Sequence, residues 1–564
     1  MQQTALDFSQ VRIDTPTFEG VRDAYTEINT ALDRARTPQE REAAIGRWDE
    51  LRRSLSAWES FVNLQFQRDT NDPERKAARD YCDEISPKLT AFEVALKRRL
   101  LADPQRAQLE QKFGTTIFAL WDADVTSFEP AIEQDMVQES KLSAEYTELI
   151  ASADIAFTGK QLNLAGLQPY REDADRETRH QAERAFWDFY GSHKAELDRI
   201  YDELVKLRHG MARKLGYENY IGLGYKRMQR IDYDQRDVER WRDQIARDVV
   251  PLAQRIVQER AARAGIAEPK YWDEKVADPR GNARPKGDLP WILARCQEAF
   301  DALHPELGAF FRLMVSGHFL DLENRAGKAG GGFCTSFPTY GMPFVFGNFN
   351  GTSHDVEVLV HEMGHAFQNY RSRGQILTDY LWPTYESAEI DSMSLEYLAH
   401  PQMERFFGED VDRFRRDHLS DALLFLPYGV AVDHFQHLVY ANPDATPAER
   451  DQMWRSMEQR YLPWRDYGDL AHPAAGGLWQ EKRHIYRSPF YYIDYTLAQC
   501  CALQFWARSR RDHAGAMADY VALCGRGGEA PFQALARGAN LKSPFDEGVL
   551  TGVVAEARSV LSLT

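Results

Sequence analysis

Apolar residues recur at helical spacing through most of the first 260 residues. The first such stripe, whose members fall on one face of a helix, consists of Val21, Tyr25, Ile28 and Leu32. A second helix is predicted from Pro38, because Thr37 and Glu40 have the spacing of a capping box. The same periodicity predicts further helices over 87–110, 137–155, 172–215 and 235–264. We therefore expect a core built by helices packing on helices.

The helical pattern breaks at two places. Residues 265–290 are rich in proline, glycine and charge, which predicts an exposed excursion. Residues 325–355 alternate glycines and prolines with short apolar runs, which predicts strands and turns, with "PFVFGNFNG" (343–351) as one strand. Helical periodicity returns at 355 and continues nearly to the end. The pattern as a whole indicates a mainly α protein with a small β component.

Composition narrows the class of protein. The chain has 564 residues, of which 43% are hydrophobic and 12% aromatic, so it is long enough and apolar enough to fold into a large globular body. Its formal charge of −17 repels phosphate backbones and anionic lipids, which argues against nucleic acid and membranes as partners. The composition gives no indication of the oligomeric state.

The cysteines and the apolar runs of the sequence indicate in which cellular compartment the protein works. The six cysteines are sparse and form neither a disulfide framework nor a Cys-x-x-Cys zinc motif. No secretory signal is recognisable at the amino terminus, and the longest apolar run, 422–432, is too short to cross a bilayer. We expect a cytoplasmic protein.

One short motif suggests chemistry. His361 and His365 lie four residues apart within "HEMGH", so on a helix both imidazoles face the same side and can reach one metal ion. A helix over 355–372 is predicted by the apolar stripe Val356, Val360, Met363, Phe367 and Tyr370. Glu362 would then point at a water on the metal and serve as its base. At this stage two helix-surface histidines without a metal remain an alternative.

A third ligand is expected from the segment "PTYESAEIDSMSLEYLAH" (383–400), which has helical spacing. It carries four acids that repel one another in a half-buried helix unless a cation compensates: Glu386, Glu389, Asp391 and Glu396. Glu389 and Glu396 are seven residues apart and share a face. A helix that delivered Glu389 to both histidines would complete a His₂Glu site with one position left for water.

Three stretches resemble the thimet oligopeptidase and oligoendopeptidase F group of zinc metallopeptidases, and the bacterial oligoendopeptidase branch in particular. They are "HEMGHAFQ", "AEIDSMSLE" and "GGFCTSFPTYGMPFVFGNFNGTSHDVEVLVHE". The resemblance covers roughly 325–400 and 480–505. It implies that His361, His365 and Glu389 bind one zinc ion per chain and that Glu362 is the base. It also implies that Glu396 orients a ligand without binding the metal.

The same resemblance implies an architecture. It is a large, mainly helical, two-lobed zincin-type metallopeptidase with a deep central channel and a small β-sheet beside the zinc. Residues 1–155 would form a helical part of the channel wall, and residues 156–564 the catalytic region. The edge of the sheet would pair with an extended substrate, and 343–351 would be that edge strand or its neighbour.

Hydrogen-bond donors for the reaction are expected in "EKRHIYRSPFYYIDYTLAQ" (481–499), where the family has a histidine followed by a tyrosine-rich helix. Such donors stabilise the oxyanion that forms during peptide hydrolysis. We select His484, Tyr492 and Tyr495 as catalytic, from a stretch that also contains Tyr486 and Tyr491. Aromatic packing between helices is the alternative for each tyrosine.

These observations predict a zinc endopeptidase that hydrolyses internal bonds of short, unstructured oligopeptides by Glu362-assisted attack of zinc-bound water. Two alternatives remain. A zinc carboxypeptidase on a related helical scaffold would share the motif, but its His-Pro-Phe and Asp-x-Arg-x-Thr signatures are missing. A non-catalytic peptide-binding protein would have little reason to keep Glu362 beside intact ligands.

Overall fold

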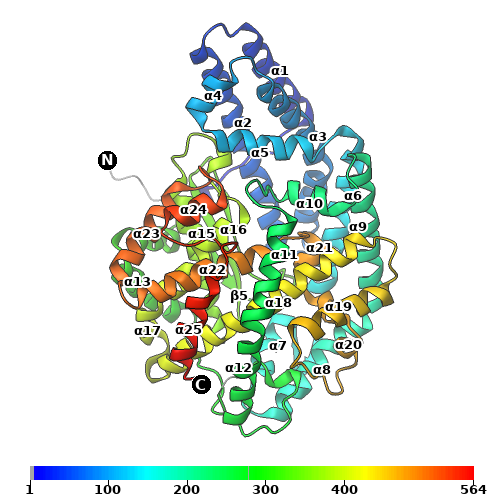
Figure 1. The fold of residues 1–564 in the computed structure, drawn as a ribbon. Coiled ribbons are helices and arrows are strands. Elements are labelled where there is room, and N and C mark those ends of the chain that lie inside the picture. The colour runs from blue at the N-terminus through cyan, green and yellow to red at the C-terminus, as the bar shows by residue number, and fades with distance from the viewer. Residues whose placement is uncertain (1–5, 277, 564) are drawn as a thin grey trace.

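In the computed structural model, which describes residues 6–276 and 278–563, most of the chain is helical (Figure 1). Five helices near the amino terminus make the upper part of the molecule in Figure 1. They are α1 (Phe18–Arg34), α2 (Pro38–Arg68), α3 (Pro73–Leu101), α4 (Arg106–Phe113) and α5 (Thr115–Thr126). The predicted stripe is confirmed, because all four of its residues are buried on α1. The predicted capping box is also confirmed, with Thr37 and Glu40 bonded to each other's backbone amides at the start of α2.

The middle of the chain continues with helices and a short hairpin. These elements are α6 (Glu133–Ala151), β1 (Ile155–Phe157), β2 (Lys160–Leu162), α7 (Leu164–Arg171), α8 (Arg176–Ser192), α9 (Lys194–Lys214), α10 (Tyr220–Arg227), α11 (Gln235–Gln244), α12 (Val250–Arg263), α13 (Leu289–Leu303) and α14 (Pro305–Ser316). The carboxyl-terminal half adds α15 (His354–Ser372), α16 (Tyr385–Leu398), α17 (Glu404–Phe407), α18 (Val411–Ala441), α19 (Pro447–Tyr461), α20 (Ala471–Ala474), α21 (Arg483–Arg487), α22 (Tyr492–Ser509), α23 (His513–Arg526), α24 (Phe532–Gly538) and α25 (Val549–Leu561).

The boundaries of three predicted helices were wrong. The helix predicted over 87–110 ends at Leu101, and Asp103 accepts a hydrogen bond from the Gln105 amide in the turn before α4. The helix predicted over 172–215 is two helices, because the His193 ring bonds to the Phe189 carbonyl and ends α8. The helix predicted over 137–155 stops at Ala151. Periodicity hides such breaks when both sides of a break bury the same face.

Three strands form the sheet beside the centre of the molecule, in the order β3-β5-β4. They are β3 (Leu320–Glu323), β4 (Phe333–Phe337) and β5 (Met342–Phe349). β5 runs parallel to β3 and antiparallel to β4. The strand predicted at 343–351 is therefore the middle one, and β4 is the edge next to it.

The excursion predicted at 265–290 is only partly exposed. Tyr271 and Trp272 are buried in a short 3₁₀ turn, and the Asp273 carboxylate accepts hydrogen bonds from Arg176 and Arg179 of α8. The two aromatic side chains and the buried ion pair thus hold this segment against the rest of the protein. Its glycine, proline and charged residues had predicted that it would be exposed to solvent.

The apolar side chains of the described residues divide into two clusters. The smaller one draws on residues between 21 and 121 and on Leu377 and Tyr380, which precede α16. Tyr380 donates a hydrogen bond to the Phe113 carbonyl (2.7 Å) and accepts one from the Ile117 amide (3.0 Å). Because Leu142 and Tyr146 of α6 belong to the larger cluster, α6 packs with the main body. The division of the chain at residue 155 stays a prediction.

None of the helices in the described part of the chain combines the length and the apolar run that a bilayer crossing requires.

Candidate metal centre

α15 carries the His-Glu-x-x-His motif, and its start is held by a side chain. The Asp355 carboxylate accepts hydrogen bonds from the backbone amides of Asn350 and Gly351, which tightens the turn between β5 and the helix. The apolar stripe is buried against the body at Val356, Val360, Met363 and Phe367. The helix predicted over 355–372 is confirmed, and His361 and His365 lie one turn apart on it.

The glycine inside the motif allows α16 to come very close. A Cβ atom added at Gly364 would lie 2.5 Å from the Cα of Ser392 and 2.7 Å from the Asp391 carbonyl oxygen. Both distances are shorter than any non-bonded contact that a carbon atom tolerates. α15 and α16 therefore pack backbone against backbone at this point, which brings the acidic face of α16 to the histidines.

Glu389 meets both histidines, as predicted. Its Oε2 lies 3.2 Å from Nε2 of His361 and 3.3 Å from Nε2 of His365. One ligand atom from each of the three residues lies within 4.8 Å of the other two. The two helices thus direct two imidazole nitrogens and one carboxylate oxygen at the same small volume.

The charges around this volume suit a divalent cation. Burial opposes ionisation of Glu389, but the two histidines outweigh it and hold the pKa of that carboxyl well below 4.5. Glu362, Glu389 and Glu396 form no ion pair with lysine or arginine among the described residues. A bound cation would compensate these buried carboxylates when the histidines beside them are neutral. Two histidines and a glutamate are a donor set that zinc accepts, so the residues fit the ion.

Glu396 links His361 to two further histidines. Its Oε1 lies 2.7 Å from Nδ1 of His361, and its Oε2 lies 2.8 Å from Nε2 of His418. Nδ1 of His418 in turn lies 2.9 Å from Nε2 of His400. This chain of contacts holds the His361 ring with Nε2 toward Glu389. The sequence analysis missed His418 and His400, because no motif connects α18 with α16.

Glu362 points toward the start of β4. It is buried, and no described residue hydrogen-bonds to its Oε2. Its Oε1 would lie 3.3 Å from a Cβ added at Gly332, so the glycine before β4 leaves room for the carboxylate. Burial raises the pKa of Glu362 above 4.5. A carboxylate with a raised pKa and a free oxygen is suited to accepting a proton.

His484 and Tyr495 lie together beside Glu389. The Tyr495 hydroxyl is 3.2 Å from Nε2 of His484. Burial and the nearby Arg483 cation hold the pKa of His484 well below 6.5, so its ring is neutral. Burial and the Glu389 carboxylate hold the pKa of Tyr495 well above 10. Both groups keep a proton that can be donated in a hydrogen bond.

Tyr491 also reaches the metal centre, although the sequence analysis did not select it. Its hydroxyl donates to Oε1 of Glu389 at 2.5 Å, and its ring stacks on His484 with centroids 5.6 Å apart. Tyr491 is the residue before α22, and its backbone angles are already helical. Its place in the tyrosine-rich stretch was the only available signal.

Tyr492 and Tyr486 lie deeper. The Tyr492 ring is buried and packs edge-on against His484 and Tyr428. The Tyr486 ring stacks on Tyr146 of α6, with centroids 4.0 Å apart. Tyr486 therefore packs in the core, and its hydroxyl donates to the Leu197 carbonyl at 3.4 Å.

A cavity of about 370 Å³ lies between α2 and β4. Its walls are Ser56, Glu59, Ser60, Asn63, Leu64 and Gln67 of α2, Phe333, Cys334 and Thr335 of β4, and Arg487 of α21. The cavity follows the edge strand whose first neighbour, Gly332, adjoins Glu362.

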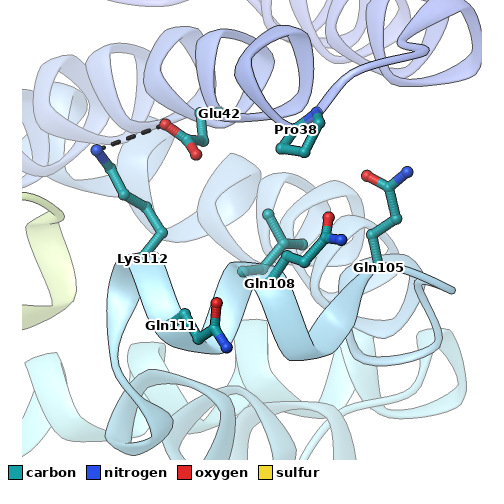
Figure 2. A pocket seen from close by; sticks show the side chains of 7 residues that line it. Pro38, Glu42, Gln105, Gln108, Gln111 and Lys112 are labelled. Atoms are coloured by element: carbon teal, nitrogen blue, oxygen red, sulfur yellow. Dashed lines mark ion pairs between the residues drawn. The ribbon is translucent and has the colours of Figure 1, made fainter.

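A second cavity, of about 330 Å³, lies between α2 and α4 (Figure 2). Figure 2 shows its polar side chains, among them the Glu42–Lys112 ion pair (3.4 Å) and three glutamines. Its lining contains no histidine, cysteine or other residue of the metal centre. It gives no indication of chemistry.

Comparison with known proteins agrees with this geometry. The profile of the family described as peptidase family M3 matches residues 170–553, and that of the peptidase M3 N-terminal domain matches residues 8–128. A search of curated proteins found no match.

Three solved structures are similar over almost their whole length. One described as oligoendopeptidase F is 46% identical over 99% of both chains, with a TM-score of 0.98. Pz peptidase A, solved with an inhibitor, is 43% identical over 99% of both chains, with a TM-score of 0.98. An oligoendopeptidase F from Bacillus anthracis is 40% identical over 100% of this chain and 99% of its own, with a TM-score of 0.93.

Proposed function

The chain belongs to peptidase family M3, and from this membership we propose which of its side chains carry out the reaction. The protein is a zinc metallopeptidase of the oligoendopeptidase kind. The observation that carries the assignment of residues is the meeting of His361, His365 and Glu389 beside Glu362.

His361, His365 and Glu389 would hold one zinc ion per chain. The ion, when bound, polarises a water molecule and the carbonyl of the peptide bond. Glu362 takes a proton from the attacking water and passes it to the leaving amine nitrogen. The raised pKa of Glu362 supports both halves of this transfer, because the group must accept a proton and then release it.

His484 and Tyr495 donate hydrogen bonds to the carbonyl oxygen as it becomes negative. Their neutral, protonated state supports this role, since each keeps a proton to offer. Tyr492 belongs to the same set as a positioning residue, because its ring contacts both His484 and Tyr495. Tyr491 orients Glu389 through its hydroxyl.

The substrate is an unstructured oligopeptide lying along the β4 edge. An extended peptide can pair with the free backbone groups of an edge strand, whatever its side chains. The cavity between α2 and β4 supports this placement, because its α2 wall supplies hydroxyl and amide groups. Residues 1–155, which include α2, would thus form part of the channel wall.

The cytoplasm is the compartment we propose. All six cysteines are free thiols, and five of them are buried, which suits a reducing environment. Nucleic acid and membranes are not proposed as partners, given the formal charge of −17.

Glu362→Gln tests the proposed base. The variant should keep zinc, because Glu362 is not a ligand, and should lose turnover by about a factor of 10³. Turnover is measured on an internally quenched peptide with a blocked carboxyl end, and zinc by metal analysis. Unchanged turnover would rule out the base.

His365→Ala is the matched variant, and it should lose the metal. Full zinc occupancy in His365→Ala would remove His365 from the ligand set. Cutting of the blocked peptide also separates this enzyme from a carboxypeptidase, which needs a free carboxyl end.

A further inference from the structure

Two arginines on α21 lack the acidic partner that each buried arginine of the described chain has. Arg483 and Arg487 lie one turn apart, and neither forms an ion pair with a carboxylate in residues 6–276 and 278–563. Buried arginines elsewhere, such as Arg171 and Arg230, each contact an acid. Unpaired guanidinium groups in a partly buried position point to a ligand that brings its own negative charge.

Both arginines lie near the cavity between α2 and β4, where the substrate is proposed to bind. Arg483 donates to the carbonyl oxygens of Gly330 and Gly332, each at 3.0 Å, just before the edge strand β4. Arg487 lines the cavity between α2 and β4, together with Phe333 and Thr335. The Arg487 guanidinium therefore borders the volume that an extended peptide would occupy.

The electrostatics of Arg487 support the same conclusion. Burial and the nearby Arg483 cation lower the pKa of Arg487 to about 10, so its positive charge is poorly compensated. No ion pair joins Arg487 to Glu59, the acid in the same lining, and Glu59 accepts a hydrogen bond from Ser86 (2.7 Å). Burial also raises the pKa of Glu59 above 4.5.

α21 itself is held rigidly. The fully buried Arg208 of α9 donates to the Tyr486 carbonyl at 2.5 Å, to Tyr440 at 3.0 Å and to Glu139 at 2.7 Å. Arg487, the next residue after Tyr486, thus projects from an anchored backbone. A preorganised cation binds an anion at less entropic cost than a mobile one.

We propose that Arg487 binds a carboxylate of the peptide substrate in the cavity between α2 and β4, so that oligopeptides with a negative charge at that point are preferred. The inference rests on the proposed function, since it concerns the groove of the same site. A planar guanidinium can donate two parallel hydrogen bonds to a carboxylate, which makes it selective for that group. The carboxylate can be the carboxyl end of a short peptide or an Asp or Glu side chain.

A preference of this kind would run against the charge of the whole chain. At −17 the protein repels anionic peptides at long range. Tighter binding of an anionic peptide therefore has to come from a local cation. A preference for anionic peptides that disappears when Arg487 is replaced can therefore be attributed to Arg487.

Binding to zinc-loaded Glu362→Gln protein tests the inference without turnover. The probes are fluorescent peptides of one sequence, with a free or an amidated carboxyl end, and with Asp or Asn at successive single positions. We expect at least one carboxylate to tighten binding about tenfold or more relative to its neutral match. A tightening by the free end identifies the chain terminus, and a tightening by Asp identifies the side chain.

Adding Arg487→Gln should abolish that difference and leave the affinity for the neutral peptide within about twofold. The control is Lys112→Gln, which removes the same charge in the cavity of Figure 2 and should keep the difference. Arg487→Lys keeps the charge without the planar fork, and should retain an intermediate preference. If Arg487→Gln does not fold, the Arg487→Lys variant still tests the inference.

Three results would overturn the inference: equal binding of all peptides by the Glu362→Gln protein, no binding of any peptide, or an unchanged preference in the Arg487 variants. Turnover by the wild-type protein is scored separately. If wild-type protein cuts none of the peptides but binds the anionic ones through Arg487, the proposed function fails and the carboxylate site stands.

Discussion

Glu396 lies between His361 and His418, and each of its oxygens contacts one of the two rings. The other histidine of the motif, His365, has no such support, because its buried Nδ1 has no hydrogen-bond partner among the described residues. The metal centre is therefore asymmetric. The orientation of the His361 ring depends on its contact with Glu396, which in turn contacts His418 of α18. His418 can be replaced without changing His361, His365 or Glu389.

Replacing His418 should weaken zinc binding. His418→Leu removes the group that holds Glu396, and loss of a partner of this kind costs about 10–100-fold in metal affinity. His418→Gln keeps a side-chain N–H donor and should restore much of the affinity. Competition with a chelator measures both variants. A folded His418→Leu protein with wild-type zinc affinity would contradict the role.

At the scale of secondary-structure elements, the site depends on how closely α15 and α16 pack. Gly364 faces the backbone of α16 at Ser392, so any side chain there has to push the two helices apart. Glu389 lies one turn before Ser392, whose hydroxyl donates to Oε2 of Glu389 at 2.9 Å. A shift of α16 would therefore move the Glu389 carboxylate itself.

Gly364→Ala should lower the free energy of unfolding by about 1–3 kcal/mol and also weaken zinc binding, because the added methyl overpacks the crossing. Denaturant unfolding and metal analysis measure the two effects. Gly210→Ala is the matched control: it lies inside α9, and an added Cβ has no atom within 4 Å. It should be neutral or stabilise by up to about 1 kcal/mol. Equal effects of the two substitutions would refute the packing argument.

A second property at this scale is the anchoring of α6, α9 and α10 by Glu139. Burial opposes its ionisation, but Arg227 and Arg208 outweigh burial and lower the pKa of Glu139 from 4.5 to about 2. Arg208 also holds the α21 backbone through the Tyr486 carbonyl. The ionised Glu139 thus supports the element that carries His484 and Arg487.

Because the folded-state pKa of Glu139 is depressed, its contribution to stability is present above pH 4.5 and is lost as the pH falls toward 2. The difference of about 2.5 pKa units corresponds to about 3 kcal/mol. Glu139→Gln should therefore lose more stability relative to wild type at pH 6 than at pH 3. Denaturant unfolding at both values measures this. If the difference in unfolding free energy between wild type and Glu139→Gln were as large at pH 3 as at pH 6, the proposed stabilising role of ionised Glu139 would be wrong.

At the scale of the whole molecule, the connection between α15 and α16 joins the two apolar clusters. Leu377 and Tyr380 lie in this connection and pack in the smaller cluster. Between them, Asp379 forms a 2.6 Å ion pair with the buried Arg52 of α2. The helices that carry His361, His365 and Glu389 are thus tied to α2, which faces β4 across the cavity.

This arrangement predicts a limit on substrates. In the proposed placement a peptide lies extended between α2 and β4 to reach Glu362, so a flexible peptide should be cut much faster than the same sequence inside a folded domain. The measurement compares cleavage of one sequence as a free peptide and as a strand of a stable domain, by mass mapping of products. Equal rates for both would contradict the proposed channel.

The sequence alone determined the helical class, the α15 and α16 helices, and the i, i+4 pair His361 and His365 with Glu362 between them. These features depend on local spacing: an i, i+4 pair, a capping box or an apolar stripe acts within a few turns of one chain segment. The roles of these residues and of Glu389 as ligands and base stay predictions. Only the tertiary structure revealed the contact of His418 with Glu396, the hydrogen bond of Tyr491 to Glu389, the break at His193 and the edge position of β4. Side chains tens to hundreds of residues apart meet only when packing fixes the crossing of whole helices. A Cβ added at Gly364 would lie 2.5 Å from α16, and no spacing along the chain encodes that distance.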